Sequence, residues 1–396
     1  MRVDVLSREY PPEVYGGAGV HVTELVRALR RRGGLDVRVR CFGAPRDESW
    51  TRAYPTPEEL RVANPALQAF GTDLTIADAC AGTDIVHSHT WYAALGGHLA
   101  GLLHSVPHVL TAHSIEPLRP WKAEQLGGGY ALSSWAERTA IESAGAVIAV
   151  SDAMRTDLLR AYPDIDAQRV HVVHNGIDTD DWRPGVDEQR VRRLGVDPDR
   201  PSVLFVGRVT RQKGLPYLLR AASSLPPDVQ LVLCAGAPDT VEIGAEVEAL
   251  VAGLRSTHEV VLIERQLPRM DVIALLSAAS VFACPSIYEP LGIVNLEAMA
   301  CETAVVATAT GGIPEVVVDG ETGRLVSVEQ ASDGNGDPTD PEAFVSDFAA
   351  ALLEVLEDPV RAGELGRAGR VRAERDFSWV TIAEATVAVY ASIAGP

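Results

Sequence analysis

The sequence is poor in cysteine and has no long apolar run, and both absences exclude whole classes of protein. Its 396 residues include five cysteines, an odd number without Cys-x-x-Cys spacing, which argues against a disulfide framework and against a structural zinc site. No window approaches the run of about twenty uncharged apolar residues that a membrane-spanning helix needs. The first apolar run already contains a charge, at Asp4. We therefore expect a cytoplasmic protein with reduced, buried thiols.

Basic residues are also scarce. Thirty-five Lys and Arg stand against 54 Asp and Glu, which gives a formal net charge of -19. Nonspecific attraction to nucleic acid or to an anionic membrane is then disfavoured, and we expect neither as a partner. An anionic substrate must be bound by local cations.

Several catalytic and metal-binding motifs are absent as well. The chain has no nucleophile elbow, no Walker lysine motif and no Cys-His pair in a suitable context. It has no His-x-x-x-His spacing with acidic partners on one element. Three Asp-x-Asp triplets, at 164–166, 178–180 and 197–199, all fall in polar connecting segments. We expect no metal ion and no cofactor.

The chain does contain apolar, β-rich runs that alternate with amphipathic helical patterns. This alternation predicts an α/β protein with two consecutive parallel-sheet units. The predicted strands cover residues 3–6, 37–40, 85–87, 109–111, 147–150 and 170–173, then 202–207, 231–234, 260–263, 281–284 and 305–307. The predicted helices include 20–31, 134–144, 214–223, 293–300 and 381–393. Residues 176–201, rich in Asp, Arg, Pro and Gly, are typical of a linker.

The segment 288–300 runs through a Pro and a Gly into an apolar-faced helix. Pro290 suits the first turn of a helix, and Gly292 lets a ligand approach the backbone. The amides of residues 291–294 then point at whatever lies in front of the helix. This arrangement is typical of an anion site.

Two glutamates accompany that helix start. Glu289 is predicted to lie just outside the helix and Glu297 about a turn inside it. One carboxylate can then face a sugar and the other a ribose, with a diphosphate between them. The alternative is that both only complement the positive end of the helix dipole.

Two cations follow a clear strand in the second half. Arg208 is predicted at the carboxyl end of that strand and Lys213 just before the next helix. Ligands in open α/β sheets bind at such strand ends, and paired cations there suit a diphosphate leaving group. Solvated loop charges are the alternative, and we expect Arg211 to be one of them.

A glycine turn and a histidine mark the same kind of position in the first half. Residues 16–19 read Gly-Gly-Ala-Gly between a strand and a helix, so main-chain amides there can reach a phosphate or a sugar. A tight connection without a ligand is the alternative. His113 ends another strand, which favours it over His21, His87 and His89 as the functional histidine.

Together these features resemble the retaining glycosyltransferases of the GT-B fold. A closer resemblance, to actinobacterial enzymes of the glycogen synthase and α-maltose-1-phosphate synthase type in family 4, is carried by three motifs. They are REYPPEVYGGAGVHV at 8–22, TAHS at 111–114 and VHNGID at 173–178.

The family implies two Rossmann-like domains that face a central cleft, with the nucleotide sugar mostly on the second and the acceptor on the first. It also implies a C-terminal helix that crosses back to the first domain. We accordingly predict an N-terminal domain at 1–177, a linker at 178–200, a donor domain at 201–375 and a returning helix at 376–396.

The same resemblance assigns roles on the second domain. Arg208 and Lys213 would bind the donor diphosphate and stabilise the leaving nucleoside diphosphate. Glu297 would accept hydrogen bonds from the ribose, and Glu289 would bind the transferred glucose near its 3- and 4-hydroxyls. The main-chain amides that would assist are those of Gly292, Ile293 and Val294.

On the first domain, the glycine turn would approach the diphosphate, and His113 would present its ring or its carbonyl to the β-face of the sugar. The donor-binding residues of the turn would be Gly16, Gly17, Ala18 and Gly19. With retention, the acceptor attacks from the leaving-group side and the leaving phosphate takes its proton. The resemblance thus implies neither an enzymic base nor a metal, unlike the hydrolases that use two carboxylates.

One departure bears on the acceptor. Typical bacterial glycogen synthases carry Lys-Thr-Gly-Gly-Leu near the N-terminus, whereas residues 14–18 here are Val-Tyr-Gly-Gly-Ala. The absent lysine favours transfer of glucose from ADP-glucose to glucose 1-phosphate, which forms α-maltose 1-phosphate. A phosphorylated acceptor needs cations on the first domain, and the candidates are Arg119, Lys122 and Arg138.

Two alternatives stay open. The first is a glycogen synthase that extends α-1,4-glucan from ADP-glucose. The second, outside enzymes, is a nucleotide-sugar-binding sensor. A homodimer is possible for any of these.

Overall fold

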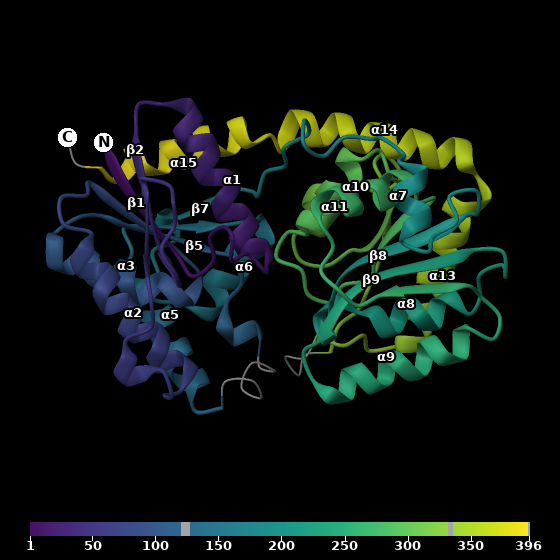
Figure 1. Ribbon diagram of the computed structural model, residues 1–396, viewed down its shortest axis with the longest axis horizontal. Helices are drawn as coiled ribbons and strands as arrows, with labels where there is room; N and C mark the ends of the chain where they lie inside the picture. The colour runs from purple at the N-terminus through teal and green to yellow at the C-terminus, as the bar shows by residue number, and fades with distance from the viewer. Residues whose placement is uncertain (120–126, 332–335, 395–396) are drawn as a thin grey trace. The chain divides into compact units, whose positions relative to one another are not determined.

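The computed structural model describes residues 1–119, 127–331 and 336–394. The chain forms two compact units, one comprising Met1–Gly176 and Trp379–Pro396 and the other Ile177–Ser378 (Figure 1). Each unit is built on an all-parallel sheet, as the alternation of strands and helices predicted. The predicted cleft between the units stays a prediction.

The first unit contains a seven-stranded sheet in the order β3-β2-β1-β4-β5-β6-β7. Its strands are β1 (Arg2–Ser7), β2 (Asp36–Phe42), β3 (Thr51–Tyr54), β4 (Ile85–His89), β5 (His108–Ala112), β6 (Ala146–Ala149) and β7 (Val170–Val172). Its helices are α1 (Gly17–Arg32), α2 (Pro65–Ala79), α3 (Thr90–His104), α5 (Gly129–Ser143) and α6 (Asp152–Ala161). Every residue of β4, β5 and β6 is buried, as expected for parallel strands covered on both faces.

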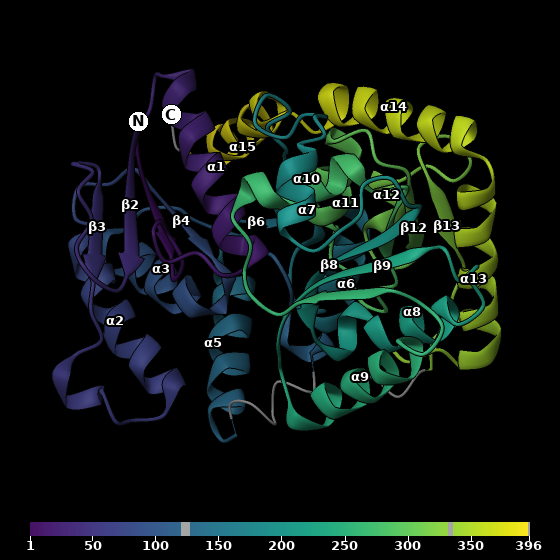
Figure 2. The ribbon, with the colours of Figure 1, turned by 45° about the vertical axis from the view of Figure 1, so that its right-hand side comes forward.

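The second unit repeats the plan with six strands in the order β10-β9-β8-β11-β12-β13. They are β8 (Ser202–Val209), β9 (Gln230–Pro238), β10 (Val260–Ile263), β11 (Val281–Cys284), β12 (Val305–Thr308) and β13 (Arg324–Val326). The helices are α7 (Glu188–Arg193), α8 (Leu215–Ala222), α9 (Val241–Leu254), α10 (Arg269–Ala278), α11 (Ile293–Ala300), α12 (Ile313–Val316), α13 (Pro341–Glu357) and α14 (Pro359–Asp376). Helices α8 and α9 cover one face of the sheet, and α10 and α11 cover the other (Figure 2).

The predicted linker, residues 178–200, lies within the second unit. It contains α7, which packs on α10, and Arg190 of α7 pairs with Asp271 of α10 at 2.6 Å. The chain passes between the units beside Gly176 and again beside Ser378.

The C-terminal helix, α15 (Trp379–Ile393), returns to the first unit as predicted and packs on α1. A buried chain of hydrogen bonds fastens it: the Tyr390 hydroxyl lies 2.7 Å from Nδ1 of His87, whose Nε2 lies 2.7 Å from Oγ1 of Thr111. His87 thus joins β4, β5 and α15, and both its ring nitrogens are occupied.

The five cysteines are all buried and unpaired, in agreement with the expected reduced thiols. Among the residues that the structure describes, no helix is both long and apolar enough to cross a membrane.

The role of Tyr390 can be tested by Tyr390→Phe. The substitution should lower the free energy of unfolding by about 1–3 kcal/mol, because it leaves Nδ1 of the buried His87 without a partner. Urea unfolding measures the effect. Tyr217→Phe is the matched control, since its hydroxyl makes a longer, partly buried contact of 3.3 Å with Asp337. Equal losses in both variants would contradict the assignment.

Candidate active site

Each sheet has a point at which its strand order reverses, between β1 and β4 in the first unit and between β8 and β11 in the second. Ligands of open α/β sheets bind outside the carboxyl ends of strands at such points. The predicted site residues lie at the carboxyl ends of these strands or of the strand next to them. Residues 16–19 follow β1, His113 follows β5, Arg208 ends β8, and Glu289 follows β11.

Lys213 is placed by a short 3-10 turn, Arg211–Lys213, between β8 and α8. Gly214 closes this turn with a φ of +63°, in the left-handed region that favours glycine. A side chain there would also overlap the carbonyl oxygen of Pro285. This close approach brings the turn against the loop that follows β11.

Lys213 and Glu289 form an ion pair, with Nζ 2.5 Å from Oε2, and only 19% and 11% of their side chains are exposed. Burial opposes the charged lysine, but Glu289 outweighs this effect and raises the pKa of Lys213. The Ser286 hydroxyl also donates to Glu289, at 3.4 Å.

Two further glycines, Gly311 and Gly312, hold the backbone of Glu289 in place. The amide of Gly312 donates to the Glu289 carbonyl at 3.0 Å. Gly311 has a φ of +53°, and a side chain there would overlap the same carbonyl. The loop is therefore fixed at its backbone, independently of the ion pair.

The start of α11 differs in one detail from the prediction. The helix begins at Ile293 with Gly292 as N-cap, so Pro290 lies before the helix and not in its first turn. Gly292 has a φ of +93°, which bends the chain into the helix. The amides of Ile293 and Val294 occupy the first turn, where no intrahelical acceptor exists. Anion binding at this helix start stays a prediction.

Glu297 lies in α11, partly buried. Burial raises the pKa of its carboxyl to about 8, although Arg269 and Lys213 oppose the rise. Lys213 thus acts electrostatically on both glutamates, and Arg208 opposes part of the rise in the pKa of Lys213. The four side chains predicted from the sequence form one electrostatic group.

Arg208 is held by a residue that the sequence reasoning missed. Its guanidinium donates to Asp239 at 2.8 Å, and 48% of its side chain is exposed. Arg211 is 60% exposed and lies 3.8 Å from Asp337, as expected for a solvated charge.

In the first unit, the glycine turn is shorter than expected. Helix α1 begins at Gly17, so Gly17, Ala18 and Gly19 form its first turn and Gly16 is the N-cap. The carboxylate of Glu9 accepts hydrogen bonds from the amides of Tyr15 and Gly16, at 3.0 and 2.8 Å. The Gly16 amide thus has an acceptor within the chain, and its contact with the donor stays a prediction.

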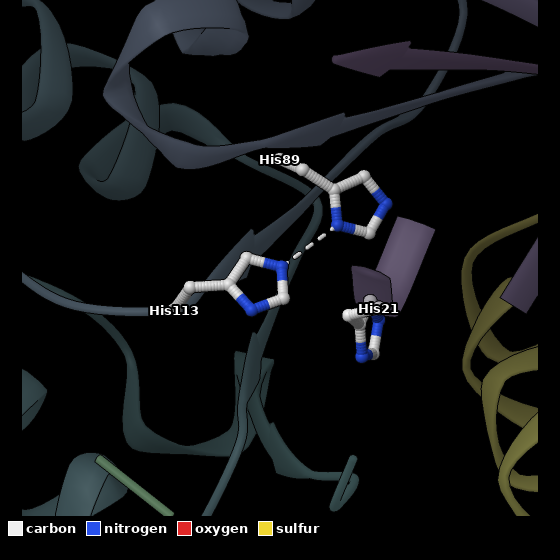
Figure 3. Close-up of side chains that lie close together, drawn as sticks. All are labelled: His21, His89 and His113. Atoms are coloured by element: carbon white, nitrogen blue, oxygen red, sulfur yellow. Dashed lines mark hydrogen bonds between the residues drawn. The ribbon is translucent and has the colours of Figure 1, made fainter. Parts of the chain in front are cut away.

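The first unit also gathers three histidines that sequence spacing separates. His21 of α1, His89 at the end of β4 and His113 after β5 lie close together (Figure 3). Nδ1 of His89 lies 3.1 Å from Nε2 of His113. Burial holds the pKa of all three well below the usual range, that of His21 at about 4. His113 is therefore neutral at physiological pH.

The three predicted acceptor cations differ from one another in their surroundings. Arg119 is 16% exposed; it donates to the Ser114 hydroxyl at 2.9 Å and lies 4.0 Å from Glu116. Arg138 is exposed on α5, with its guanidinium 5.8 Å from the ring centre of Tyr162. Lys122 lies outside the described residues.

Two protein-family models match the chain, one in each half. Residues 15–181 match the model of Glycosyltransferase Family 4, and residues 186–372 match that of Glycosyl transferases group 1. The chain is 57% identical, over 99% of its length and 100% of the relative, to the alpha-maltose-1-phosphate synthase of Mycolicibacterium smegmatis. It belongs to glycosyltransferase family 4.

More distant relatives of this family 4 chain include the glycogen synthase of Mycobacterium tuberculosis, 31% identical over 98% of this chain and 94% of the relative. Among solved structures, the sucrose-phosphate synthase of Thermosynechococcus elongatus aligns with a TM-score of 0.78 at 24% identity, covering 99% of this chain and 98% of the other. This likeness confirms the predicted GT-B fold.

Sequence reasoning about the family 4 site missed Glu9, Asp239 and the approach of His21 and His89 to His113. Glu9 stands within the motif at 8–22, but its bond to the glycine turn depends on a loop conformation that local spacing does not reveal. The histidines come from three separate elements. A search for ligand spacing within one element cannot find them.

The raised pKa of Glu297 generates a prediction. Ribose hydroxyls that donate to this carboxyl favour its ionised form, so donor binding should release a proton below pH 8. The affinity for ADP-glucose should therefore increase as pH rises from 6.5 toward 8, by at most about tenfold per pH unit for one proton. Calorimetric titration measures it. Glu297→Gln should flatten the profile, and Glu321→Gln, an exposed control, should not. A flat profile for the unaltered chain would refute the ribose contact.

Proposed function

We propose that this family 4 glycosyltransferase moves glucose from ADP-glucose to glucose 1-phosphate with retention, forming α-maltose 1-phosphate without a metal. The full-length identity of 57% to an alpha-maltose-1-phosphate synthase, against 31% to a glycogen synthase, carries the proposal. The absent lysine in the turn at 14–18 agrees with this choice of acceptor.

The second unit would hold the donor. Lys213 would leave Glu289 for the diphosphate, where with Arg208 it stabilises charge that develops on the departing nucleoside diphosphate. Glu289, released from the lysine, would accept hydrogen bonds from the glucose hydroxyls. The first-turn amides of Ile293 and Val294 supply further donors for the phosphates.

The ion pair suits this exchange because Lys213 and Glu289 are each other's partners before a donor binds. A buried charge without a partner is costly, so Lys213 and Glu289 compensate each other until the ligand replaces both contacts. The cations and amides then supply the positive charge that a divalent ion would otherwise bring. Excess chelator should accordingly leave most activity intact.

The first unit would contribute a neutral His113 beside the sugar. An uncharged ring does not repel the positive charge of an oxocarbenium-like transition state, whereas an imidazolium would. The acceptor hydroxyl would attack from the side of the leaving phosphate, which takes its proton, so that the new bond keeps the α configuration.

Arg119 is the described cation best suited to the acceptor phosphate. Its contacts with Ser114 and Glu116 hold it in one position, so less side-chain entropy is lost when a phosphate binds. Arg138, by contrast, is exposed, and among the described residues its guanidinium lies over the Tyr162 ring.

A substrate panel tests the proposal. ADP-, UDP- and GDP-glucose are each supplied with glucose 1-phosphate or with glycogen, and products are analysed by proton NMR. ADP-glucose with glucose 1-phosphate should give an α-linked disaccharide phosphate faster than glycogen is extended. Efficient elongation of glycogen with no disaccharide phosphate would establish the polymerase alternative instead.

Within the same panel, Arg119→Gln should raise the KM for glucose 1-phosphate by about ten- to a hundredfold, the equivalent of a lost charge-assisted contact of about 1.5–3 kcal/mol. The KM for ADP-glucose should change little. Arg61→Gln is the matched control, since Arg61 is an exposed cation in the same unit. An unchanged KM in Arg119→Gln would remove Arg119 from the acceptor site.

A further inference from the structure

His21, His89 and His113 form a compact cluster within the first unit (Figure 3). One ring nitrogen from each lies within 4.8 Å of the corresponding nitrogens of the other two. The rings of His21 and His113 are 4.7 Å apart between centres, and those of His21 and His89 are 5.5 Å apart. Three separate elements, α1, β4 and the segment after β5, thus present imidazoles to one point.

Several of these nitrogens have no hydrogen-bond partner. His21 is 2% exposed, and neither of its ring nitrogens is bonded within the described structure. Nε2 of His89, a residue with no exposed surface, is likewise unpartnered. A buried polar atom without a partner costs roughly 1–3 kcal/mol, so the cluster is poised for a ligand that accepts nitrogen lone pairs.

The chemistry and the spacing of the nitrogens both fit a transition-metal cation. Tetrahedral zinc with bonds of about 2.0–2.1 Å separates its ligand atoms by roughly 3.3 Å. Nδ1 of His89 and Nε2 of His113 are 3.1 Å apart and share a hydrogen bond, which a cation bound to both would replace. The ligand nitrogens of all three rings lie within 4.8 Å of one another. Burial keeps the three imidazoles neutral, which is the form that binds a metal.

The surroundings distinguish these three histidines from the fourth one nearby. The ring of His87 lies 4.2 Å from that of His89, tilted by 37°, but its two nitrogens contact Tyr390 and Thr111. Asn175 lies close enough to His21 to raise its pKa against the effect of burial, yet its buried Oδ1 forms no hydrogen bond within the usual limits. This oxygen could orient His21 or a water on the metal.

We propose that His21, His89 and His113 form a binding site for a zinc-class cation, with three imidazole ligands and an open fourth position. Soft or borderline cations such as Zn²⁺, Co²⁺ and Cu²⁺ suit imidazole, whereas Mg²⁺ and Ca²⁺ prefer oxygen. The proposed cation is not a cofactor of the transfer reaction. A bound cation would occupy a ring nitrogen of His113. This leads to one consequence that rests on the proposed function: Zn²⁺ should inhibit glucosyl transfer.

The site itself can be tested without any sugar substrate. The full chain, free of a histidine tag and stripped with chelator, is titrated with Co²⁺ while its visible absorption is recorded. One equivalent should produce the d-d bands of a low-coordinate cobalt site, and Zn²⁺ should abolish them by competition. Mg²⁺ should leave the bands unchanged.

His21→Gln and His89→Gln should each weaken Co²⁺ and Zn²⁺ binding by at least about 100-fold, since even the loss of a residue that only orients a ligand costs 10- to 100-fold. His104→Gln is the matched control, because His104 contacts the Ala77 carbonyl outside the cluster. Circular dichroism and thermal midpoints check folding, and His113→Gln replaces any variant that fails to fold. No saturable cobalt bands, or equal affinity in the cluster variants and the control, would overturn the proposal.

Discussion

Parallel pairing of every strand is the constraint on which both candidate sites depend. Parallel strands end at one edge of their sheet, so residues that are far apart in sequence meet wherever the strand order reverses. In the second unit this edge brings Lys213 and Glu289 to 2.5 Å across 76 positions of sequence. In the first unit it brings His21, His89 and His113 together. The two sheets share one topology, but charged side chains lie at the edge of the second sheet and neutral imidazoles at the edge of the first.

Close backbone approach is what makes the charged edge possible. Gly214 lets the Lys213 turn lie against Pro285, and Gly311 lets its own turn lie against Glu289. Both residues have positive φ, so a side chain at either position would be strained as well as crowded. The ion pair therefore sits between two loops whose separation is set by glycine. The backbone positions of the two loops are thus fixed, and in the proposed function only the side-chain contact between Lys213 and Glu289 changes when a donor binds.

Much of this plan could be predicted from the sequence, for reasons that are visible in particular elements. Strands such as residues 109–111 and 281–284 are mainly apolar runs, and their ends identified His113 and the loop of Glu289 correctly as edge positions. The returning helix was predicted from the family resemblance. The short edge strands β3 and β13 were not predicted, because three or four residues carry little periodicity. The hydrogen bonds between Glu9 and the glycine turn and between Arg208 and Asp239 were not predicted. Each depends on the conformation of a loop, which hydrophobic periodicity does not reveal. The histidine cluster escaped because its members share no element.

The most direct test of the donor site is the turnover of Lys213→Ala with ADP-glucose and glucose 1-phosphate. If Lys213 leaves Glu289 to stabilise the departing diphosphate, kcat should fall by about two orders of magnitude or more. Arg211→Ala, which removes a solvated cation two positions earlier in the same turn, should keep near-normal turnover. Circular dichroism confirms that both variants are folded. Near-normal turnover in Lys213→Ala, or an equal loss in Arg211→Ala, would contradict the account.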